Sequence, residues 1–171
     1  GRVGDVRDYD TVEDVFADFR PHVVYHAAAY KHVGPMELTP KEAIDTNITG
    51  TYNVLHNAKK HSVKKFVFIS TDKAVQSTSV MGATKRVGEI MVRNQGYTVV
   101  RFGNVLGSRG SLIPIWERQL NSGKPLTITD PEMVRYFMTI EEAVSLVIEA
   151  GEGNNDGKIL VMDMGKPVRI L

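Results

Sequence analysis

A hydroxyl, a carboxylate and an ammonium group follow one another in the sequence at Thr71, Asp72 and Lys73, directly after an apolar run. Each group can take part in proton transfer, the amine when burial or positive neighbours lower its pKa. A further ammonium, Lys85, follows four residues after Met81, so these two side chains share one face of an expected helix. A turn with a solvated ion pair is the alternative for Asp72 and Lys73, but the nearby Lys85 favours a site for proton transfer.

Small residues follow a second apolar run, at Ala27, Ala28 and Ala29. Short side chains at a strand end let a planar ligand approach the backbone, and close helix packing is the alternative. His26, which precedes them, is more typical of a hydrogen-bonded core histidine than of a catalyst. Because the five histidines show no metal-ligand spacing, we expect no metal site.

Polar and cationic residues gather after the third apolar run, in the glycine-rich loop 103–110 and beyond it. Guanidinium groups match phosphate oxygens in pairs, so these residues could hold a diphosphate, although each alone is typical of a surface. The candidates are Lys31, Asn104, Ser108, Arg109 and Arg135.

Two further polar positions are weaker candidates. Asp5, followed by Val6, lies in a short polar stretch that could follow a strand, where an aspartate is most often a cap or turn residue. Asn47 lies among apolar neighbours on an expected helix, and a buried amide needs hydrogen-bond partners. Its partner is either the backbone, the usual case, or a neighbouring catalytic side chain.

The elements that position these residues alternate between strands and helices. Continuous apolar runs predict strands that are buried on both faces, over residues 22–29, 65–70 and 97–102. Apolar spacing predicts helices over 10–19, 39–61 and 80–94. We expect Thr39 to cap the second helix, and the buried stripe of that helix to consist of Ile44, Ile48, Tyr52 and Leu55. This alternation predicts an α/β fold with a Rossmann-like, doubly wound parallel sheet.

The pattern changes after Phe102. We expect a helix over 111–120, short strands over 126–129 and 135–138, a helix over 140–150 that Thr139 caps, and a strand over 158–163. We therefore divide the chain into residues 1–103, the C-terminal part of a dinucleotide-binding domain, and residues 104–171, a small substrate lobe. The lobe is interleaved with the last strands of the sheet.

Composition excludes several classes of protein. The 171 residues are 42% hydrophobic and 24% charged, which argues against disorder. A formal net charge of +1 argues against a nucleic-acid-binding protein. Without cysteine there is no disulfide, thiolate nucleophile or cysteine-bound zinc. No apolar run reaches the roughly 20 residues of a membrane-spanning helix.

Several motifs, in order, resemble one family. They are Thr71–Lys73, Met81–Arg86, Arg101–Ser108, Pro131–Met133 and Arg135–Met138, with His26–Val33 and Asp163–Gly165 as further matches. Together they resemble the nucleotide-sugar 4,6-dehydratases of the polysaccharide-biosynthesis (CapD-like) type. That group belongs to the extended short-chain dehydrogenases/reductases, and its best-known activity is UDP-N-acetylglucosamine 4,6-dehydratase.

This resemblance implies an enzyme that uses NAD(P), with NAD favoured, and a UDP-sugar substrate. Hydride leaves C4 of the hexose, water is eliminated across C5 and C6, and hydride returns to C6 to give a 4-keto-6-deoxy sugar for a capsule or another surface polysaccharide. By resemblance, Thr71 and Asp72 handle the O4 proton, Asp72 is the acid at O6, and Lys73 is the base at C5.

The same resemblance assigns binding roles. Lys85 binds the nicotinamide ribose, Asp5 and Val6 flank the adenine, and Ala27–Ala29 with Asn47 lie on the nicotinamide side. Asn104 and Arg135 bind the sugar diphosphate, and Lys31, Ser108 and Arg109 also lie on the substrate side.

The chain departs from the superfamily pattern at two points. The glycine-rich turn that binds the cofactor pyrophosphate is absent, so we interpret the chain as an internal piece of a longer enzyme. Met81 occupies the position of the superfamily tyrosine, and a thioether cannot exchange a proton. One branch of the dehydratases carries methionine there, which leaves the O4 proton to Thr71 and Asp72.

Two other functions stay open. A nucleotide-sugar epimerase or reductase of the same superfamily needs hydride transfer alone, and an epimerase normally needs a tyrosine base. The second alternative is that the chain is a truncated fragment without catalytic activity.

From the resemblance we also expect a homo-oligomer formed through the helices at 39–61 and 80–94. We expect a cytoplasmic location, and larger members of the family carry membrane helices upstream.

Overall fold

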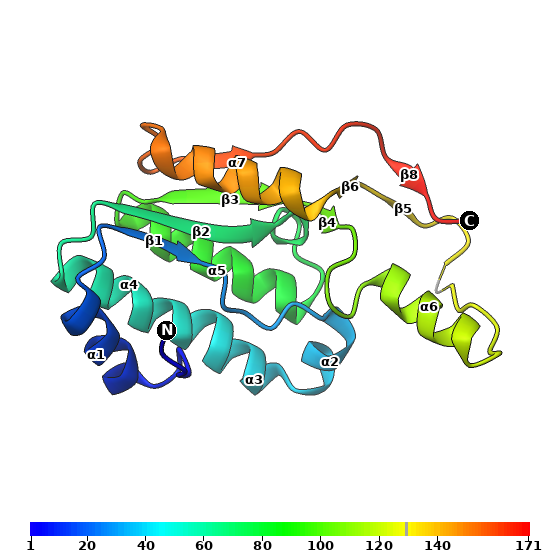
Figure 1. Ribbon diagram of the computed structural model, residues 1–171, viewed down its shortest axis with the longest axis horizontal. Coiled ribbons are helices and arrows are strands. Elements are labelled where there is room, and N and C mark those ends of the chain that lie inside the picture. The colour runs from blue at the N-terminus through cyan, green and yellow to red at the C-terminus, as the bar shows by residue number, and fades with distance from the viewer. Residues whose placement is uncertain (129) are drawn as a thin grey trace. The chain divides into compact units, whose positions relative to one another are not determined.

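The computed structural model describes residues 1–128 and 130–171, and its elements are labelled in Figure 1. The chain divides into two compact units. The first comprises Gly1–Arg101 and Val147–Val161, and the second comprises Phe102–Leu146 and Met162–Leu171. The predicted roles of the two parts, cofactor binding and substrate binding, stay predictions.

The first unit contains a four-stranded sheet in the order β1-β2-β3-β7. Its strands are β1 (Val23–His26), β2 (Lys65–Thr71), β3 (Thr98–Phe102) and β7 (Ile159–Val161). Parallel pairing joins β1 to β2 and β3 to β7. Phe66, Val67 and Phe68 are at most 1% exposed, as expected for a strand covered on both faces. The predicted parallel sheet is confirmed, although β1 ends at His26 and leaves the three alanines in the next loop.

Helices cover both faces of this sheet (Figure 1). The helices α1 (Tyr9–Phe19), α4 (Thr51–Lys60) and α5 (Val80–Asn94) lie on one face. The C-terminal part of α7 (Ile140–Glu152) lies on the other, so close to β1 that a Cβ at Gly151 would collide with the Tyr25 side chain. This is the predicted doubly wound α/β arrangement in partial form.

The main core of the first unit lies between the sheet and its helices. Asp8 starts α1 by accepting hydrogen bonds from the backbone N–H groups of Asp10 and Thr11, and the helix then turns Val12 and Phe16 inward. Burying a side chain of this size stabilises the fold by roughly 1.5–3 kcal/mol. The core comprises Val12, Phe16, Val54, Leu55, Ala58, Val63, Phe66, Phe68, Val92, Tyr97 and Val99.

The helix predicted over 39–61 is interrupted. The chain forms α2 (Val33–Leu38), α3 (Pro40–Ile44), a π-helix (Asp45–Gly50) and then α4. Thr39 does not cap α3 with its side chain; its hydroxyl donates instead to the Pro35 carbonyl at 2.9 Å. A π turn holds more residues than an α turn, so it rotates the faces of the helix.

The buried stripe predicted for this helix is therefore wrong in part. Leu55 is buried, but Ile44 is 45% exposed and Tyr52 is 53% exposed. The face that packs inward is instead lined by small and polar side chains, which are Ala43, Asn47, Thr51, Val54 and Ala58.

The second unit contains α6 (Leu112–Asn121), the N-terminal part of α7 and two small sheets. β4 (Asn104–Val105) pairs in parallel with β6 (Phe137–Met138), and β5 (Val134–Arg135) pairs antiparallel with β8 (Val168–Arg169). Thr139 caps α7 as predicted: its hydroxyl accepts from the backbone N–H of Glu142 at 3.1 Å, and Glu142 accepts from the backbone N–H of Thr139 at 2.8 Å.

Two predicted strands of this unit are wrong as stated. The run 135–138 belongs to two strands, β5 and β6, with different partners. Residues 126–128 form no strand, because Thr127 bonds to α6 instead: its carbonyl accepts from Trp116 Nε1 at 2.9 Å, and Gln119 accepts from its backbone N–H at 3.2 Å. Thr129, the last residue of that predicted strand, lies outside the described residues.

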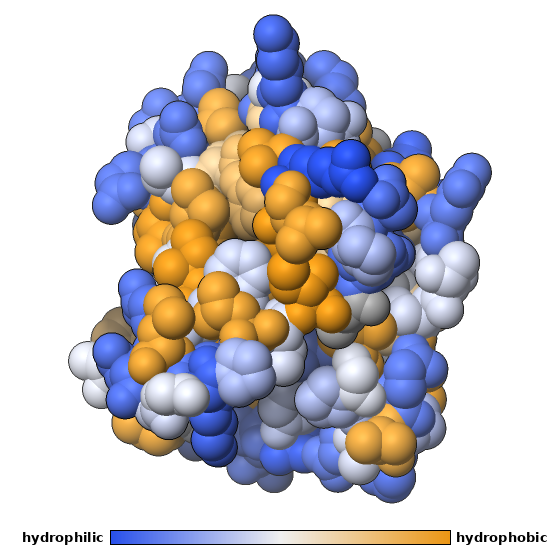
Figure 2. Space-filling model, turned by 90° about the vertical axis from the view of Figure 1, so that its right-hand side faces the viewer, coloured by the Kyte–Doolittle hydropathy of each residue, from blue (hydrophilic) through white to orange (hydrophobic). Residues whose placement is uncertain are grey.

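Figure 2 shows a face with hydrophobic side chains between hydrophilic ones, on the side where Figure 1 labels α6 and β8. Exposed apolar residues of these elements include Ile113, Leu120 and Val168.

In the described ranges 1–128 and 130–171, no helix combines the length and apolar character that crossing a membrane requires.

Candidate active site

Thr71, Asp72 and Lys73 form a small network where β2 ends and a 3-10 turn (Asp72–Ala74) begins. Oδ1 of Asp72 accepts a hydrogen bond from the Thr71 hydroxyl at 2.9 Å and from Lys73 Nζ at 3.0 Å. The Asp72 and Lys73 side chains are 42% and 34% exposed, so a ligand can reach both. The three predicted proton-transfer groups thus meet at one carboxylate oxygen.

The helix α5 packs directly onto this network. Ser79 starts α5 by accepting a hydrogen bond from the backbone N–H of Gly82 at 3.1 Å. A Cβ at Gly82 would collide with the carbonyl oxygen of Lys73, so only glycine allows this approach. The first turn of the helix that carries Met81 and Lys85 is therefore fixed against the Thr71–Lys73 turn.

Lys85 is buried on α5, with 7% exposure. Its Nζ lies 4.1 Å from the centroid of the Phe68 ring. Across the described part of the chain, its Nζ forms no hydrogen bond or ion pair. Burial lowers the pKa of Lys85 to about 8, against a smaller opposing effect of the Glu89 charge. The amine is thus able to change its protonation state near neutral pH.

Met81 is 3% exposed and belongs to a second, smaller core cluster with Met36 and Ala43. Its thioether has no proton to exchange, so this side chain, predicted to stand at the superfamily tyrosine position, supplies packing. Its carbonyl accepts a hydrogen bond from the Thr84 hydroxyl at 2.8 Å. The proton-transfer role predicted for Thr71 and Asp72 stays a prediction, and Met81 offers no competing group.

Asn47, within the π-helix, fixes the loop that follows β1. Its Oδ1 accepts from the backbone N–H of Tyr30 at 2.8 Å, and its Nδ2 donates to the Tyr30 carbonyl at 3.0 Å. Nδ2 also donates to the Thr84 hydroxyl at 3.0 Å. π segments often occur at functional sites. Asn47 therefore holds the alanine loop, where Ala27 and Ala28 are exposed, against α5.

His26 is a satisfied core histidine, the reading favoured from sequence. Its Nε2 lies 2.9 Å from the Thr51 hydroxyl, which itself donates to the Asn47 carbonyl, so Nε2 carries the proton. Burial, together with the charge of Lys85, lowers the pKa of His26 to about 3. The imidazole is thus neutral, and its ring stacks on Phe68 with 5.8 Å between centroids.

Asp5 and Val6 lie in a turn that α4 holds by its side chains. Asn53 Nδ2 donates to the carbonyls of Val6 and Arg7, both at 3.0 Å. The Asp5 carboxylate accepts from the Arg7 guanidinium, and these hydrogen bonds are the main cause that lowers the pKa of Asp5. The predicted adenine contact of Asp5 and Val6 stays a prediction.

The predicted substrate residues lie in both units. Lys31 follows β1 in the first unit, and partial burial lowers its pKa. In the second unit, the backbone N–H of Asn104 donates to the Tyr136 carbonyl at 3.0 Å, next to Arg135 in β5. Ser108 and Arg109 lie in the loop after β4. Their convergence on a substrate stays a prediction.

Sequence reasoning missed Glu89, the fully buried carboxylate one turn after Lys85 on α5. It binds Ser70, which immediately precedes Thr71, and Arg101 on β3. The spacing of four residues from Lys85 is the signal that could have revealed it, because residues four apart share a helix face.

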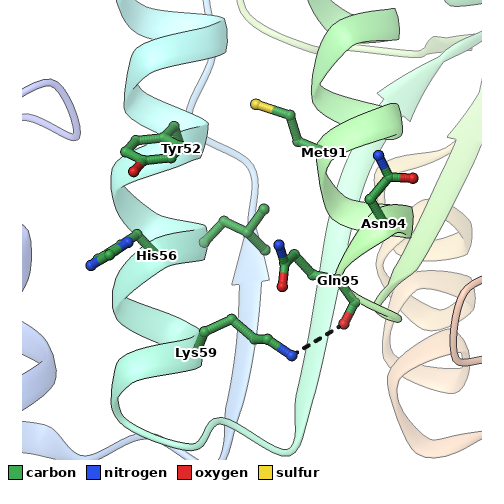
Figure 3. Close-up of a pocket in the computed structure, with 7 residues that line it drawn as sticks. Tyr52, His56, Lys59, Met91, Asn94 and Gln95 are labelled. Atoms are coloured by element: carbon green, nitrogen blue, oxygen red, sulfur yellow. Dashed lines mark hydrogen bonds between the residues drawn. The ribbon is translucent and has the colours of Figure 1, made fainter.

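A groove of about 520 Å³ lies elsewhere, between α4 and α5. In Figure 3, Tyr52, His56 and Lys59 come from one helix, Met91 and Asn94 come from the other, and Gln95 directly follows that second helix. None of these residues is a predicted site residue.

Within 1–128 and 130–171, no group of three or more His, Cys, Asp or Glu residues could hold a metal ion.

A family profile described as "Polysaccharide biosynthesis protein" matches residues 1–171. The chain belongs to this family. Among curated members, the capsular polysaccharide biosynthesis protein CapD of Staphylococcus aureus is 52% identical over 99% of this chain, which spans 29% of CapD. The UDP-glucose 4-epimerase of Rickettsia rickettsii is 42% identical over 93% of the chain and 49% of its own length. The chain therefore spans half or less of these relatives.

Solved structures confirm the fold of the family. Pen from Bacillus thuringiensis superposes with a TM-score of 0.90 at 39% identity, covering 95% of this chain and 52% of Pen. UDP-glucose 4-epimerase of Thermotoga maritima, solved with UDP-glucose, has a TM-score of 0.87 at 25% identity and covers 96% and 62%. A double mutant of the dTDP-glucose 4,6-dehydratase DesIV of Streptomyces venezuelae, with NAD and DAU bound, has a TM-score of 0.88 at 21% identity, covering 97% of this chain and 58% of DesIV.

Proposed function

We propose that the protein carrying this chain catalyses the NAD-dependent 4,6-dehydration of a UDP-N-acetylhexosamine, UDP-N-acetylglucosamine above all, for surface polysaccharide synthesis. The observation that carries this proposal is the convergence of Thr71 and Lys73 on one oxygen of Asp72, beside the turn of α5 that leads to Lys85. Dehydration needs a proton acceptor at O4, a base at C5 and an acid at O6, and this network can provide all three.

The proton at O4 passes through Thr71 to Asp72 in this scheme. The Thr71 hydroxyl already donates to Asp72 Oδ1, so it can relay a proton from the sugar to the carboxylate. Asp72 is then protonated and can donate to the leaving hydroxyl at C6. Lys73 acts in this scheme as a neutral amine, which takes the C5 proton during elimination and gives it back to C5 when hydride returns to C6.

The residues around the loop after β1 fit a nicotinamide cofactor. The buried ammonium of Lys85 makes no hydrogen bond within the described residues, so it can donate to the hydroxyls of a ribose. Ala27 and Ala28 leave the backbone accessible, and Asn47 fixes this loop. When bound, the cofactor would accept hydride from C4 and return it at C6. Asn47 makes its hydrogen bonds to Tyr30 and Thr84, so it acts as a positioning residue.

Epimerisation at C4 is the second candidate function. It is favoured by the relatives named UDP-glucose 4-epimerase, at 42% identity in Rickettsia rickettsii. A C4 epimerase needs only hydride removal and return at C4, normally with a tyrosine base. The buried methionine at position 81 and the Asp72–Lys73 pair support dehydration instead.

We further propose that two copies associate through α4 and α5. Exposed apolar side chains of these two helices include Tyr52 on α4 and Val87 and Ile90 on α5, and the groove of Figure 3 lies between the helices. In a twofold dimer, the same patch on each copy covers the other. The cytoplasmic location that the resemblance implies stays a prediction.

The test is product analysis with the complete protein, UDP-N-acetylglucosamine and NAD⁺. We expect a product lighter than the substrate by one water, and Asp72→Asn and Lys73→Ala should each lower turnover by about 10²-fold or more. Asp156→Asn is the matched control, because Asp156 pairs with Lys65 at 3.1 Å and carries no proposed role. A product of unchanged mass would contradict dehydration.

A further inference from the structure

The Glu89 carboxylate connects three elements of the first unit. Its Oε1 accepts hydrogen bonds from Ser70 Oγ at 2.6 Å and Arg101 Nε at 2.7 Å. Its Oε2 accepts from Arg101 Nη2 at 2.5 Å and from Arg86 Nη1 at 2.9 Å. Glu89 and Arg86 belong to α5, Ser70 to β2 and Arg101 to β3, so one buried carboxylate links the helix to two neighbouring strands.

Protonation of this carboxylate would break the arrangement, and its partners oppose it. Burial by itself raises the pKa of Glu89, but the hydrogen bonds from Arg101, Ser70 and Arg86 outweigh burial, so the pKa lies below its ordinary value. The Arg101 side chain is only 13% exposed, and Arg86 is the more exposed partner at 43%. The anion and the Arg101 guanidinium therefore neutralise each other inside the fold.

This cluster lies beside the proposed proton-transfer residues. Ser70 immediately precedes Thr71 on β2, and Glu89 follows Lys85 by four residues on the same face of α5. A displacement of the carboxylate would therefore move the end of β2 relative to α5. The separation between the Thr71 hydroxyl and the Lys85 ammonium would change with it.

Stability alone is a poor account of such a cluster. Removing two charges from water costs free energy that their attraction repays only with excellent geometry, and apolar residues of similar volume often stabilise a fold as well. A guanidinium that binds both carboxylate oxygens adds direction, because the pair is held in one plane. The hydrogen bond from Ser70 then ties the strand end to that plane.

We propose that Glu89 is a positioning residue, which acts through Ser70 and Arg101 to hold the strand end with Thr71 and the helix turn with Lys85 at the separation needed for reaction. The catalytic consequence rests on the proposed function, whereas the positional consequence does not. Glu89 itself touches neither substrate nor cofactor.

Ser70→Ala in the complete protein is the main test. It removes the bond between the strand end and the carboxylate but keeps the Glu89–Arg101 pair, so the fold is retained. We expect faster amide hydrogen exchange in residues 71–74 and in the turn around Lys85, with unchanged exchange in α1. We also expect kcat to fall by up to about 10²-fold, as a misplacement of about 1 Å can cause, with KM little changed.

Glu89→Gln is the second variant, and Glu13→Gln is its control. Gln keeps the shape of the side chain but leaves Arg101 without its counter-ion, so both effects should be larger than in Ser70→Ala. Glu13, on α1, also accepts two hydrogen bonds, from Lys60 at 2.8 Å and from His61 at 3.2 Å. Its substitution should leave kcat and the exchange of residues 71–74 unchanged.

The outcomes separate this proposal from the proposed function. Local loosening at 71–74 with a fall in kcat supports a positioning role. Unchanged exchange in Ser70→Ala overturns it, and so does an equal rise in exchange across the whole sheet, which would show a purely stabilising role. If the unsubstituted protein forms no dehydrated product, the proposed function fails, and the exchange measurement still decides the positional claim.

Discussion

The Nζ atom of Lys85 lies 4.1 Å from the centroid of the Phe68 ring, and His26 stacks on the same ring. An ammonium over an aromatic face gains an attraction that survives without a carboxylate partner. The neighbouring imidazole stays neutral because burial lowers the pKa of His26 to about 3. Lys85 thus lies over an aromatic ring on which a neutral imidazole stacks, and its Nζ makes no hydrogen bond within the described residues, as the proposed contact with a ribose requires.

This burial predicts that Lys85→Met stabilises the fold at neutral pH while it lowers activity. The pKa of Lys85 in the folded chain is about 8, below the value of about 10.4 expected in the unfolded chain. Between these two values the unfolded state binds more protons, so the free energy of unfolding rises with pH, by up to about 3 kcal/mol. Lys85→Met lacks this rise.

Urea unfolding of wild type and Lys85→Met at several pH values measures this effect. Taking the difference between the two proteins cancels other groups that titrate in the same window, such as Tyr97, whose pKa burial raises. We expect the difference in the free energy of unfolding, in favour of Lys85→Met, to be largest below pH about 8 and to decrease as the pH rises towards about 10. A constant difference over this range would contradict the lowered pKa of Lys85.

Met81→Leu should leave turnover within a few-fold of wild type. The side chain is buried against Met36 and Ala43, and a swap of similar volume usually costs less than about 1.5 kcal/mol. Met81→Ala should instead lower the free energy of unfolding by about 2–5 kcal/mol, because it leaves a cavity. Steady-state kinetics and urea unfolding separate the two effects. A loss of kcat in Met81→Leu as large as in Lys73→Ala would show that the thioether has a chemical role.

Asn47→Ala should weaken NAD⁺ binding by the complete protein by about tenfold or more, since unpaired buried polar groups cost about 1–3 kcal/mol. The substitution frees the backbone N–H and carbonyl of Tyr30 and so loosens the alanine loop. Thr84→Val is the matched control, because it removes the bonds of the Thr84 hydroxyl to Asn47 and to the Met81 carbonyl but keeps both bonds between Asn47 and Tyr30. Isothermal titration calorimetry measures both affinities, and equal losses in the two variants would argue against a role for the loop.

Ile90→Lys should convert the dimer to a monomer without unfolding it. Ile90 is 46% exposed on α5, so a charge there costs little in the monomer but opposes burial against a second copy. Ile113→Lys is the control, because Ile113 is similarly exposed, at 41%, on α6. Light scattering coupled to size exclusion reports the mass. Unchanged dimers of Ile90→Lys would place the interface elsewhere.

The sequence predicted the parts of the fold that local signals determine. The bounds of α5 agree with the predicted range 80–94, because Ser79 caps its start and the apolar spacing continues to its end. The strand β2 was evident because its apolar run is continuous. The network of Thr71, Asp72 and Lys73 follows directly from the end of that strand.

Features that depend on distant partners were not predictable in this way. The π-helix at 45–50 rotates the helix faces, so the apolar residues Ile44 and Tyr52 are exposed although their spacing indicated burial. Glu89 on α5 gives no sign of burial in its local sequence, because its partners Ser70 and Arg101 come from the strands β2 and β3. These three residues come together only when α5 packs on the assembled sheet.

Deuterium transfer distinguishes dehydration from epimerisation of the sugar. The complete protein is incubated with NAD⁺ and UDP-N-acetylglucosamine that carries deuterium at C4, and the product is analysed by mass spectrometry and NMR. If Thr71, Asp72 and Lys73 perform dehydration, the product is a 4-keto sugar that has lost one water and carries the deuterium at C6. A sugar of unchanged mass that keeps deuterium at C4 with inverted configuration would contradict the account and establish an epimerase.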